Sequence, residues 1–198
     1  MAGAVSPGPD GRARCDWALG TPEMLDYHDR QWGRPLRDDT DLFEMLTLEA
    51  FQSGLSWLTI LRKRDGFREA FDGFEIEKVA AYKAREIKRL MADAEIVRNR
   101  AKIAATITNA RAIRELQAGG ETLTDVIWEF APNHDDRPVP KKLSDLEPTT
   151  AESTAMAKEL KRRGFAFVGP TTAYSLMEAA GLVNDHLAGC AFRDLPAL

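Results

Sequence analysis

The sequence predicts an all-α fold, and three observations support this prediction. Apolar residues recur at helical spacing along most of the chain after Cys15, capping residues precede these runs, and glycines end them. Strand signals are almost absent, and 165–168 is the only short candidate. The 198 residues, 44% of them apolar, suit one domain with a filled core. We expect residues 1–13 to form a flexible leader and 14–198 to form a single helical domain.

Helix signals divide the first half of the chain. Asp41 and Glu44 have the spacing of a capping box, so a helix should begin there and break near Ser53 and Gly54. Ser56 is a suitable N-cap for the next helix. The helical patterns that follow cover 57–64, 77–82, 84–92 and 97–118, and the last of them stops at a glycine pair.

The second half begins with a short helical pattern over 122–131. Four prolines then predict an irregular loop over 132–148. Thr149 and Glu152 have capping-box spacing and should open a helix that runs to Arg163. The final helix should begin at Pro170, since proline suits the first helical position, and should stop at Gly181.

Composition excludes several classes of protein. No apolar run approaches the roughly 18 residues of a membrane span, and the first residues lack the apolar segment of a secretory signal, so we expect a cytoplasmic protein. Two cysteines do not make a disulfide scaffold. Lys and Arg number 27 against 31 Asp and Glu, a net charge of −4, so any binding to DNA would need a local basic patch.

Each cysteine is accompanied by a histidine, which raises the possibility of a metal site. Cys15 precedes His28, and His186 precedes Cys190 by four positions, a spacing that lets both side chains face one point. Two cysteines and two histidines complete a tetrahedral shell for zinc and mark a structural site, which would join the N- and C-terminal segments. The alternative is four unrelated residues: buried free thiols and ordinary histidines.

Glu49 is the informative residue of the first long helix. It continues the apolar row of Leu42 and Met45, where a carboxylate is costly unless it meets donors or a cation, or takes up a proton. An acid and an amide among aromatic rings would suit a pocket for a flat, positively charged heterocycle. The alternative is a helix-edge glutamate beside ordinary core tryptophans. The residues proposed for this pocket are Trp17, Tyr27, Glu49, Gln52 and Trp57.

A basic cluster follows a short turn at 92–95. Arg98, Arg100 and Lys102 lie at the start of a predicted helix, where arginines and free backbone amides could dock phosphates. The alternative is a solvated helix face.

In combination, these residues resemble the DNA-3-methyladenine glycosylase I family, a zinc-containing branch of the helix-hairpin-helix DNA glycosylases. The resemblance runs from about residue 14 to 192. The segments that carry it are Arg14–Trp17, Tyr27–Gly33, Leu42–Met45, Leu48–Glu49, Gly54–Trp57, Arg162–Gly169 and Gly181–His186.

The resemblance implies a fold, an activity and roles for particular residues. The fold would be that of the helix-hairpin-helix DNA glycosylases, with the helix-hairpin-helix near 84–118. Its turn at 92–96 would grip the DNA backbone. Glu49 would accept hydrogen bonds from the methylated adenine, Trp17, Tyr27 and Trp57 would line its pocket, and Gly54 and Leu55 would enter the gap in the duplex. The zinc ligands would be Cys15, His28, His186 and Cys190.

Two positions depart from the family pattern. Glu95 stands in the hairpin where a glycine is expected, which predicts an unfavourable positive φ if the turn keeps its geometry. Met24 stands where some members have another aromatic residue.

The implied activity is hydrolysis of the N-glycosidic bond of 3-methyladenine in alkylated double-stranded DNA, by a monofunctional enzyme without lyase activity. Methylation makes the base cationic and weakens the bond, so the enzyme must flip the nucleotide and read the charge rather than protonate a leaving group. We expect a monomer with one structural zinc and no organic cofactor. The alternatives are a zinc-stabilised module that binds damaged DNA without cutting it, and a small-molecule purine binder.

Overall fold

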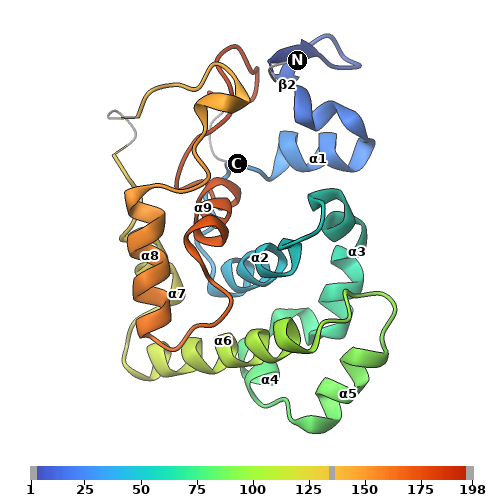
Figure 1. The fold of residues 1–198 in the computed structure, drawn as a ribbon, viewed down its shortest axis with the longest axis vertical. Coiled ribbons are helices and arrows are strands. Elements are labelled where there is room, and N and C mark those ends of the chain that lie inside the picture. Colours follow the sequence, from blue (N-terminus) through green and yellow to red (C-terminus); the bar gives the residue numbers. More distant parts are fainter. Residues whose placement is uncertain (1–3, 134–136, 195–198) are drawn as a thin grey trace.

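The computed structural model describes residues 4–133 and 137–194, and this part of the chain is almost entirely helical, as predicted (Figure 1). Residues 1–3 of the predicted leader, His134 in the predicted loop and the last four residues of the predicted domain lie outside the described residues. No described helix is long and apolar enough to cross a membrane.

The N-terminal segment differs from the prediction. Strand β1 (Val5–Pro7) pairs antiparallel with β2 (Ala13–Cys15), so residues 5–13 form a hairpin rather than a flexible leader. Arg14 secures this hairpin, because its guanidinium bonds both Asp10 and Asp29. The candidate strand over 165–168 is not a strand; it is the connection between two helices.

The helices follow the predicted order with shifted ends. Ser56 is an N-cap as predicted, and its hydroxyl accepts from the amide of Thr59. The capping box expected at Asp41 and Glu44 is wrong, because Asp38 caps this helix three residues earlier. The helices are η1 (Asp16–Gly20), α1 (Pro22–Arg30), α2 (Asp39–Gln52), α3 (Trp57–Ala70), η2 (Asp72–Phe74), α4 (Ile76–Ala80), α5 (Ala84–Ala92), α6 (Arg100–Ala118), α7 (Leu123–Trp128), η4 (Leu143–Asp145), α8 (Ala151–Arg162) and α9 (Pro170–Ala179).

Helix α2 is the centre of the core. Its residues from Leu42 to Phe51 are all buried, and it packs against α3, α6, α7 and α9 (Figure 1). A helix that is enclosed on all sides is expected to carry apolar residues on every face, and most residues of this buried stretch are apolar. Two acids interrupt that pattern, Glu44 and Glu49, and both are buried.

The predicted helix-hairpin-helix is formed by α5 and α6. The turn between them lies against α3, where a Cβ on Gly66 would meet the backbone oxygen of Glu95 at 2.7 Å, so only glycine allows this approach. Lys63 also donates to the carbonyl of Ala94 at 2.7 Å. The strain expected at Glu95 is absent: it is not among the described residues with positive φ, and its amide bonds Asp93 Oδ1.

Candidate active site and metal centre

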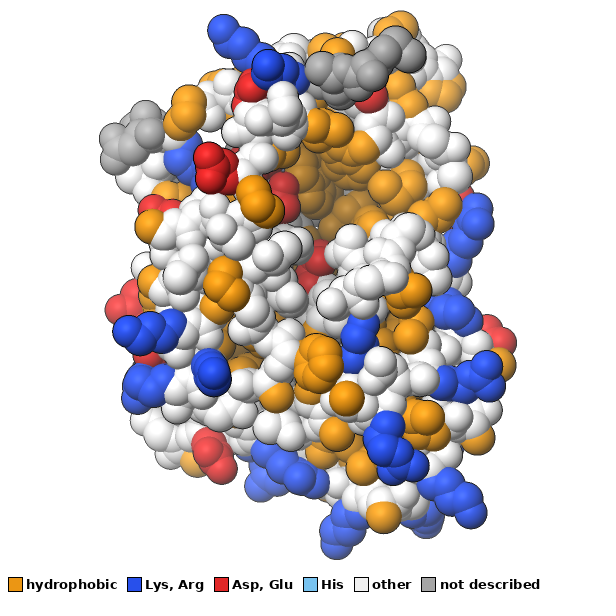
Figure 2. Space-filling view, viewed as in Figure 1, with side chains coloured by type: hydrophobic (Ala, Val, Ile, Leu, Met, Phe, Trp, Pro, Cys, Tyr) orange, Lys and Arg blue, Asp and Glu red, His pale blue; other side chains and the backbone are white. Residues whose placement is uncertain are grey.

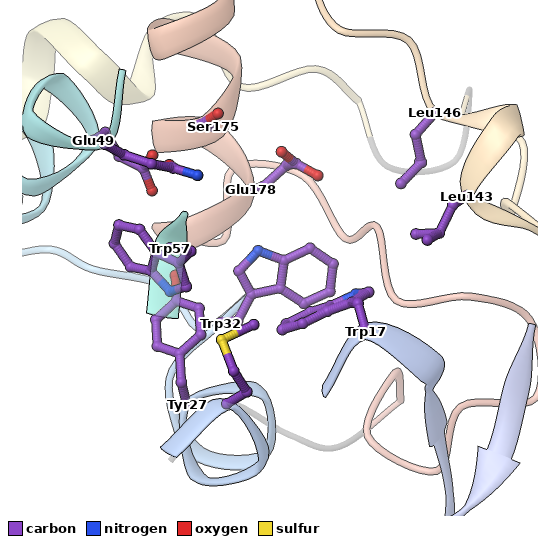
Figure 3. Close-up of a pocket in the computed structure, with 11 residues that line it drawn as sticks. Trp17, Tyr27, Trp32, Glu49, Trp57, Leu143, Leu146, Ser175 and Glu178 are labelled. Atoms are coloured by element: carbon purple, nitrogen blue, oxygen red, sulfur yellow. The ribbon is translucent and has the colours of Figure 1, made fainter. Parts of the chain in front are cut away.

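A cavity of about 300 Å³ lies between α1, α2, α3 and α9. Figure 2 shows its opening as a hollow lined by hydrophobic side chains, with acidic side chains in it. All five predicted pocket residues line it, and Figure 3 shows how they converge from separate elements. The full lining is Trp17, Met24, Tyr27, Trp32, Glu49, Gln52, Trp57, Leu143, Leu146, Ser175 and Glu178.

The aromatic walls come from η1, α1, α3 and the turn that follows α1. Tyr27 on α1 and Trp57 at the start of α3 lie 5.2 Å apart between ring centroids, inclined at 51°. Trp17 meets Trp32 edge to face at 4.9 Å. Flat walls of this kind present π-faces that attract cations and can stack against a planar ligand.

The two buried acids of α2 have opposite environments. Glu44 is paired with Arg64 at 2.5 Å and with Arg68 at 3.0 Å. Glu49 has no such partner, and its Oε2 is a buried acceptor without a hydrogen bond among the described residues. Burial raises the pKa of Glu49 to about 8. Burial thus favours the protonated form of Glu49, and a cation in the cavity would favour the ionised form.

A second buried polar atom in the cavity also has no partner in the described part of the chain. The indole Nε1 of Trp57 is a buried donor without an acceptor. Buried polar groups are nearly always paired in native proteins, so an unpaired donor and an unpaired acceptor in one cavity indicate that a polar ligand completes them.

The segment predicted to enter DNA lies at the edge of this cavity. Gly54 has φ of +84°, a conformation that favours glycine, and the next residue, Leu55, is 42% exposed. A second groove runs past both residues to Thr172 and shares Glu49 and Gln52 with the cavity. An exposed apolar side chain at the mouth is thus available to a partner.

The basic cluster divides into two exposed arginines and one buried lysine. Arg98 and Arg100 are exposed at the start of α6, and neither forms an ion pair with the described residues. Lys102 differs from the prediction, because it is buried and donates to the carbonyls of Phe51 at 2.8 Å and Ser53 at 2.7 Å. It holds the end of α2 and the loop that follows, and it does not face solvent.

The four predicted metal ligands come together. Their donor atoms lie within 4.8 Å of one another, and all four residues are buried. His28 Nε2 lies 3.1 Å from His186 Nδ1, and Cys190 Sγ lies 3.5 Å from each nitrogen. Bonds of about 2.0–2.3 Å around a tetrahedral ion place ligand atoms roughly 3.3–3.8 Å apart. The two distances from Cys190 Sγ lie in this range and the His28–His186 distance is slightly shorter, so the group is suited to hold a metal ion.

Outer contacts orient these ligands. His28 Nδ1 lies 2.8 Å from Asp29 Oδ1, which leaves Nε2 directed at the other three ligands. The metal-binding group also touches the pocket, because Trp17 packs on His28 at 5.2 Å and Trp32 on His186 at 4.7 Å. The group therefore joins the N- and C-terminal segments and supports one wall of the cavity.

Comparison with known proteins identifies the family. The methyladenine glycosylase family model matches residues 17–194. The chain belongs to this family. It is 45% identical over 177 residues to DNA-3-methyladenine glycosylase 1 of Escherichia coli K12, covering 89% of this chain and 95% of that protein. It is 43% identical to the DNA-3-methyladenine glycosylase of Haemophilus influenzae, covering 89% and 96%.

Solved structures of the family share the fold. A crystal structure of 3-methyladenine DNA glycosylase I superposes with a TM-score of 0.85 at 44% identity, covering 90% of this chain and 98% of that one. A variant of 3-methyladenine DNA glycosylase I in complex with 3-methyladenine gives a TM-score of 0.84 at 39% identity, covering 91% and 98%. A Staphylococcus aureus member gives 0.82 at 39% identity, covering 91% and 97%.

Sequence analysis missed part of the methyladenine glycosylase pocket. Trp32, Ser175 and Glu178 were not predicted to line it, nor were Leu143 and Leu146 from the irregular loop. A usable signal existed for Glu178, which is a lone acid in an apolar helix, as Glu49 is in α2. The two leucines gave no signal, because a loop without periodicity does not reveal which side chains turn inward.

Proposed function

We propose that this protein excises 3-methyladenine from alkylated double-stranded DNA as a monofunctional N-glycosidase. The observation that carries the proposal is the unpaired acid Glu49 in a cavity walled by Tyr27 and Trp57. A base that carries +1 supplies the missing partner of that acid and stacks between aromatic rings. Neutral adenine offers no charge, so it loses the strongest attraction. Both relatives named above are 3-methyladenine glycosylases, which favours the enzyme over a non-catalytic module.

The chemistry required is modest, because the cationic base leaves as a neutral molecule. The protein must extrude the nucleotide, hold the base and tolerate an oxocarbenium-like sugar while water arrives. Leu55 would fill the gap in the duplex.

The metal that we propose is zinc, in a structural role. Two thiolates and two imidazoles are ligands that zinc prefers, and a full set of four leaves no open position for a water nucleophile. Cys15, His28, His186 and Cys190 would hold it. We further propose that the protein acts as a cytoplasmic monomer.

The reaction itself tests this function. The protein is incubated with methylated duplex DNA, and the released material is separated by chromatography. We expect free 3-methyladenine and abasic strands that remain uncleaved until alkali is added. Binding to the lesion duplex without any free base would instead support the non-catalytic module.

Arg98 and Arg100 should contact DNA phosphates. Replacing either by alanine is expected to weaken binding to lesion and undamaged duplexes alike. Each lost phosphate contact should reduce the slope of log K against log salt by about 0.9. Fluorescence anisotropy over a salt series measures this slope, and an unchanged slope in both variants would place the DNA elsewhere.

Lys102→Met is the matched comparison for the variants of Arg98 and Arg100. Because the ammonium of Lys102 is buried against two carbonyls, its loss leaves those acceptors unpaired, which costs about 1–3 kcal/mol. We expect a lower melting temperature and an unchanged salt slope. A reduced slope with normal stability would return Lys102 to the DNA interface.

A further inference from the structure

One acid of the cavity has no part in the function proposed above. Glu178 lies near the end of α9, between Met177 and Ala179, which are both buried. Its own side chain is partly buried and lines the same cavity as Glu49. Helices α2 and α9 pack together, so the two acids enter the cavity from facing elements. Figure 3 shows Glu178 on α9 among the residues that line this cavity, which also include Trp17 and Trp32.

Two of the three charged side chains that affect Glu178 in the described part of the chain are negative. Within residues 4–133 and 137–194, burial and neighbouring charges act on the carboxyl of Glu178, and no hydrogen bond or ion pair to it is seen. Among the described residues, the cation that affects its pKa is Arg137, which already bonds Asp185 at 2.8 Å. Asp185 itself adds a like charge, and so does Glu49 from α2.

The energetic consequence is the same as for Glu49. Burial, followed by the negative charges of Asp185 and Glu49, raises the pKa of Glu178 to about 8. Two carboxyl groups in one cavity titrate as a pair, because the ionisation of one opposes that of the other. A cationic ligand in the cavity would therefore favour the release of protons from this pair into water.

We propose that Glu178 is a specificity-determining residue, a second carboxyl that acts with Glu49 to select cationic over neutral purines. This inference rests on the proposed function. When a base with +1 charge enters, the two carboxyl groups together release more protons to bulk water than Glu49 alone would, and the resulting negative charge faces the cation. A neutral purine does not stabilise the ionised carboxylates. The ratio of the Kd of the neutral ligand to the Kd of the cation should therefore be larger with two acids than with one.

The test compares two ligands that differ in charge. The probes are 3,9-dimethyladeninium, a permanent cation, and 3-methyladenine as its neutral free base. Trp17, Trp32 and Trp57 line the cavity, so their fluorescence reports binding. Glu178→Gln removes the charge and keeps the shape. Glu115→Gln on the exposed face of α6 makes the same change of net charge away from the cavity.

For Glu178→Gln we expect the Kd of the cation to rise by roughly tenfold, from a charge interaction in a medium of intermediate dielectric, and the Kd of the neutral base to stay within about twofold. Glu115→Gln should match the unaltered protein. Equal weakening of both ligands, or weakening of neither, would overturn the proposal.

A second measurement covers the case in which Glu178→Gln fails to fold. Glu178→Met then serves as the variant, and the Kd of the cation is followed against pH from about 5.5 to 7.5. The slope of log Kd against pH should be steeper in the unaltered protein than in the variant, because fewer protons are displaced when one acid is missing. Equal slopes would overturn the pairing. If the unaltered protein binds neither probe, the proposed function fails instead.

Discussion

Glu49→Gln should lower the rate of 3-methyladenine excision by at least about 100-fold, which is typical for the loss of one preorganised electrostatic contact. The amide keeps the shape of the side chain but cannot carry the negative charge that faces the cationic base. Single-turnover excision from methylated DNA measures this effect. Unchanged excision would remove Glu49 from base recognition.

The same substitution should not destabilise the fold. The pKa of Glu49 is raised from 4.5 to about 8, so the folded state retains a proton that the unfolded chain has already released. Protonated Glu49 makes its full contribution to the free energy of unfolding below about pH 4.5. This contribution is lost as the pH rises toward 8, at about 1.4 kcal/mol per pH unit. Glutamine does not ionise, so the variant does not lose stability over this pH range. The melting temperature of Glu49→Gln should therefore equal or exceed that of the parent at pH 8, and a marked decrease would mean that Glu49 is structural.

Cys190→Ser should have the opposite pattern. Loss of one ligand from a closed four-ligand site weakens metal binding, and that binding energy is also folding energy. We expect bound zinc to fall below about 0.2 per chain and the melting temperature to fall by at least about 5 °C, with a smaller effect on the excision rate of the remaining folded protein. Elemental analysis and thermal unfolding measure the two quantities.

Chelation of the unaltered protein is the control for this variant. Removal of the metal should reproduce the lower melting temperature, and added zinc should restore it, whereas Cys190→Ser should not respond to zinc. Pure protein that carries only a small fraction of zinc per chain would contradict the structural site.

The sequence predicted the fold well where helix periodicity and capping were strong. Ser56 and the pattern over 84–92 gave helices close to those observed. Asp38 was overlooked because Asp41 and Glu44 have capping-box spacing, although the hydrogen bonds go to Asp38. The hairpin at residues 5–13 could not be predicted, because Arg14 ties it to Asp29 on α1, and helical periodicity does not reveal such a contact.

The candidate site shows a similar limit. The place of Glu49 in a pocket was predictable, because a carboxylate in an apolar row of a helix is costly unless it has a binding partner. Lys102 was misassigned because its neighbours in sequence are basic, and periodicity does not show that the helix turns it toward the end of α2. Glu178 was missed although it has the same signature as Glu49, and only the packing of α9 on α2 brings the two acids to one cavity.

The ionisation of Glu49 on ligand entry can be observed directly. Infrared difference spectra would be recorded near neutral pH as 3,9-dimethyladeninium is added, with Glu49→Gln identifying the bands of that side chain. We predict that a protonated carboxyl signal disappears and a carboxylate signal replaces it. A Glu49 signal that does not change when the cation binds would contradict the view that this acid exists to meet a charged base.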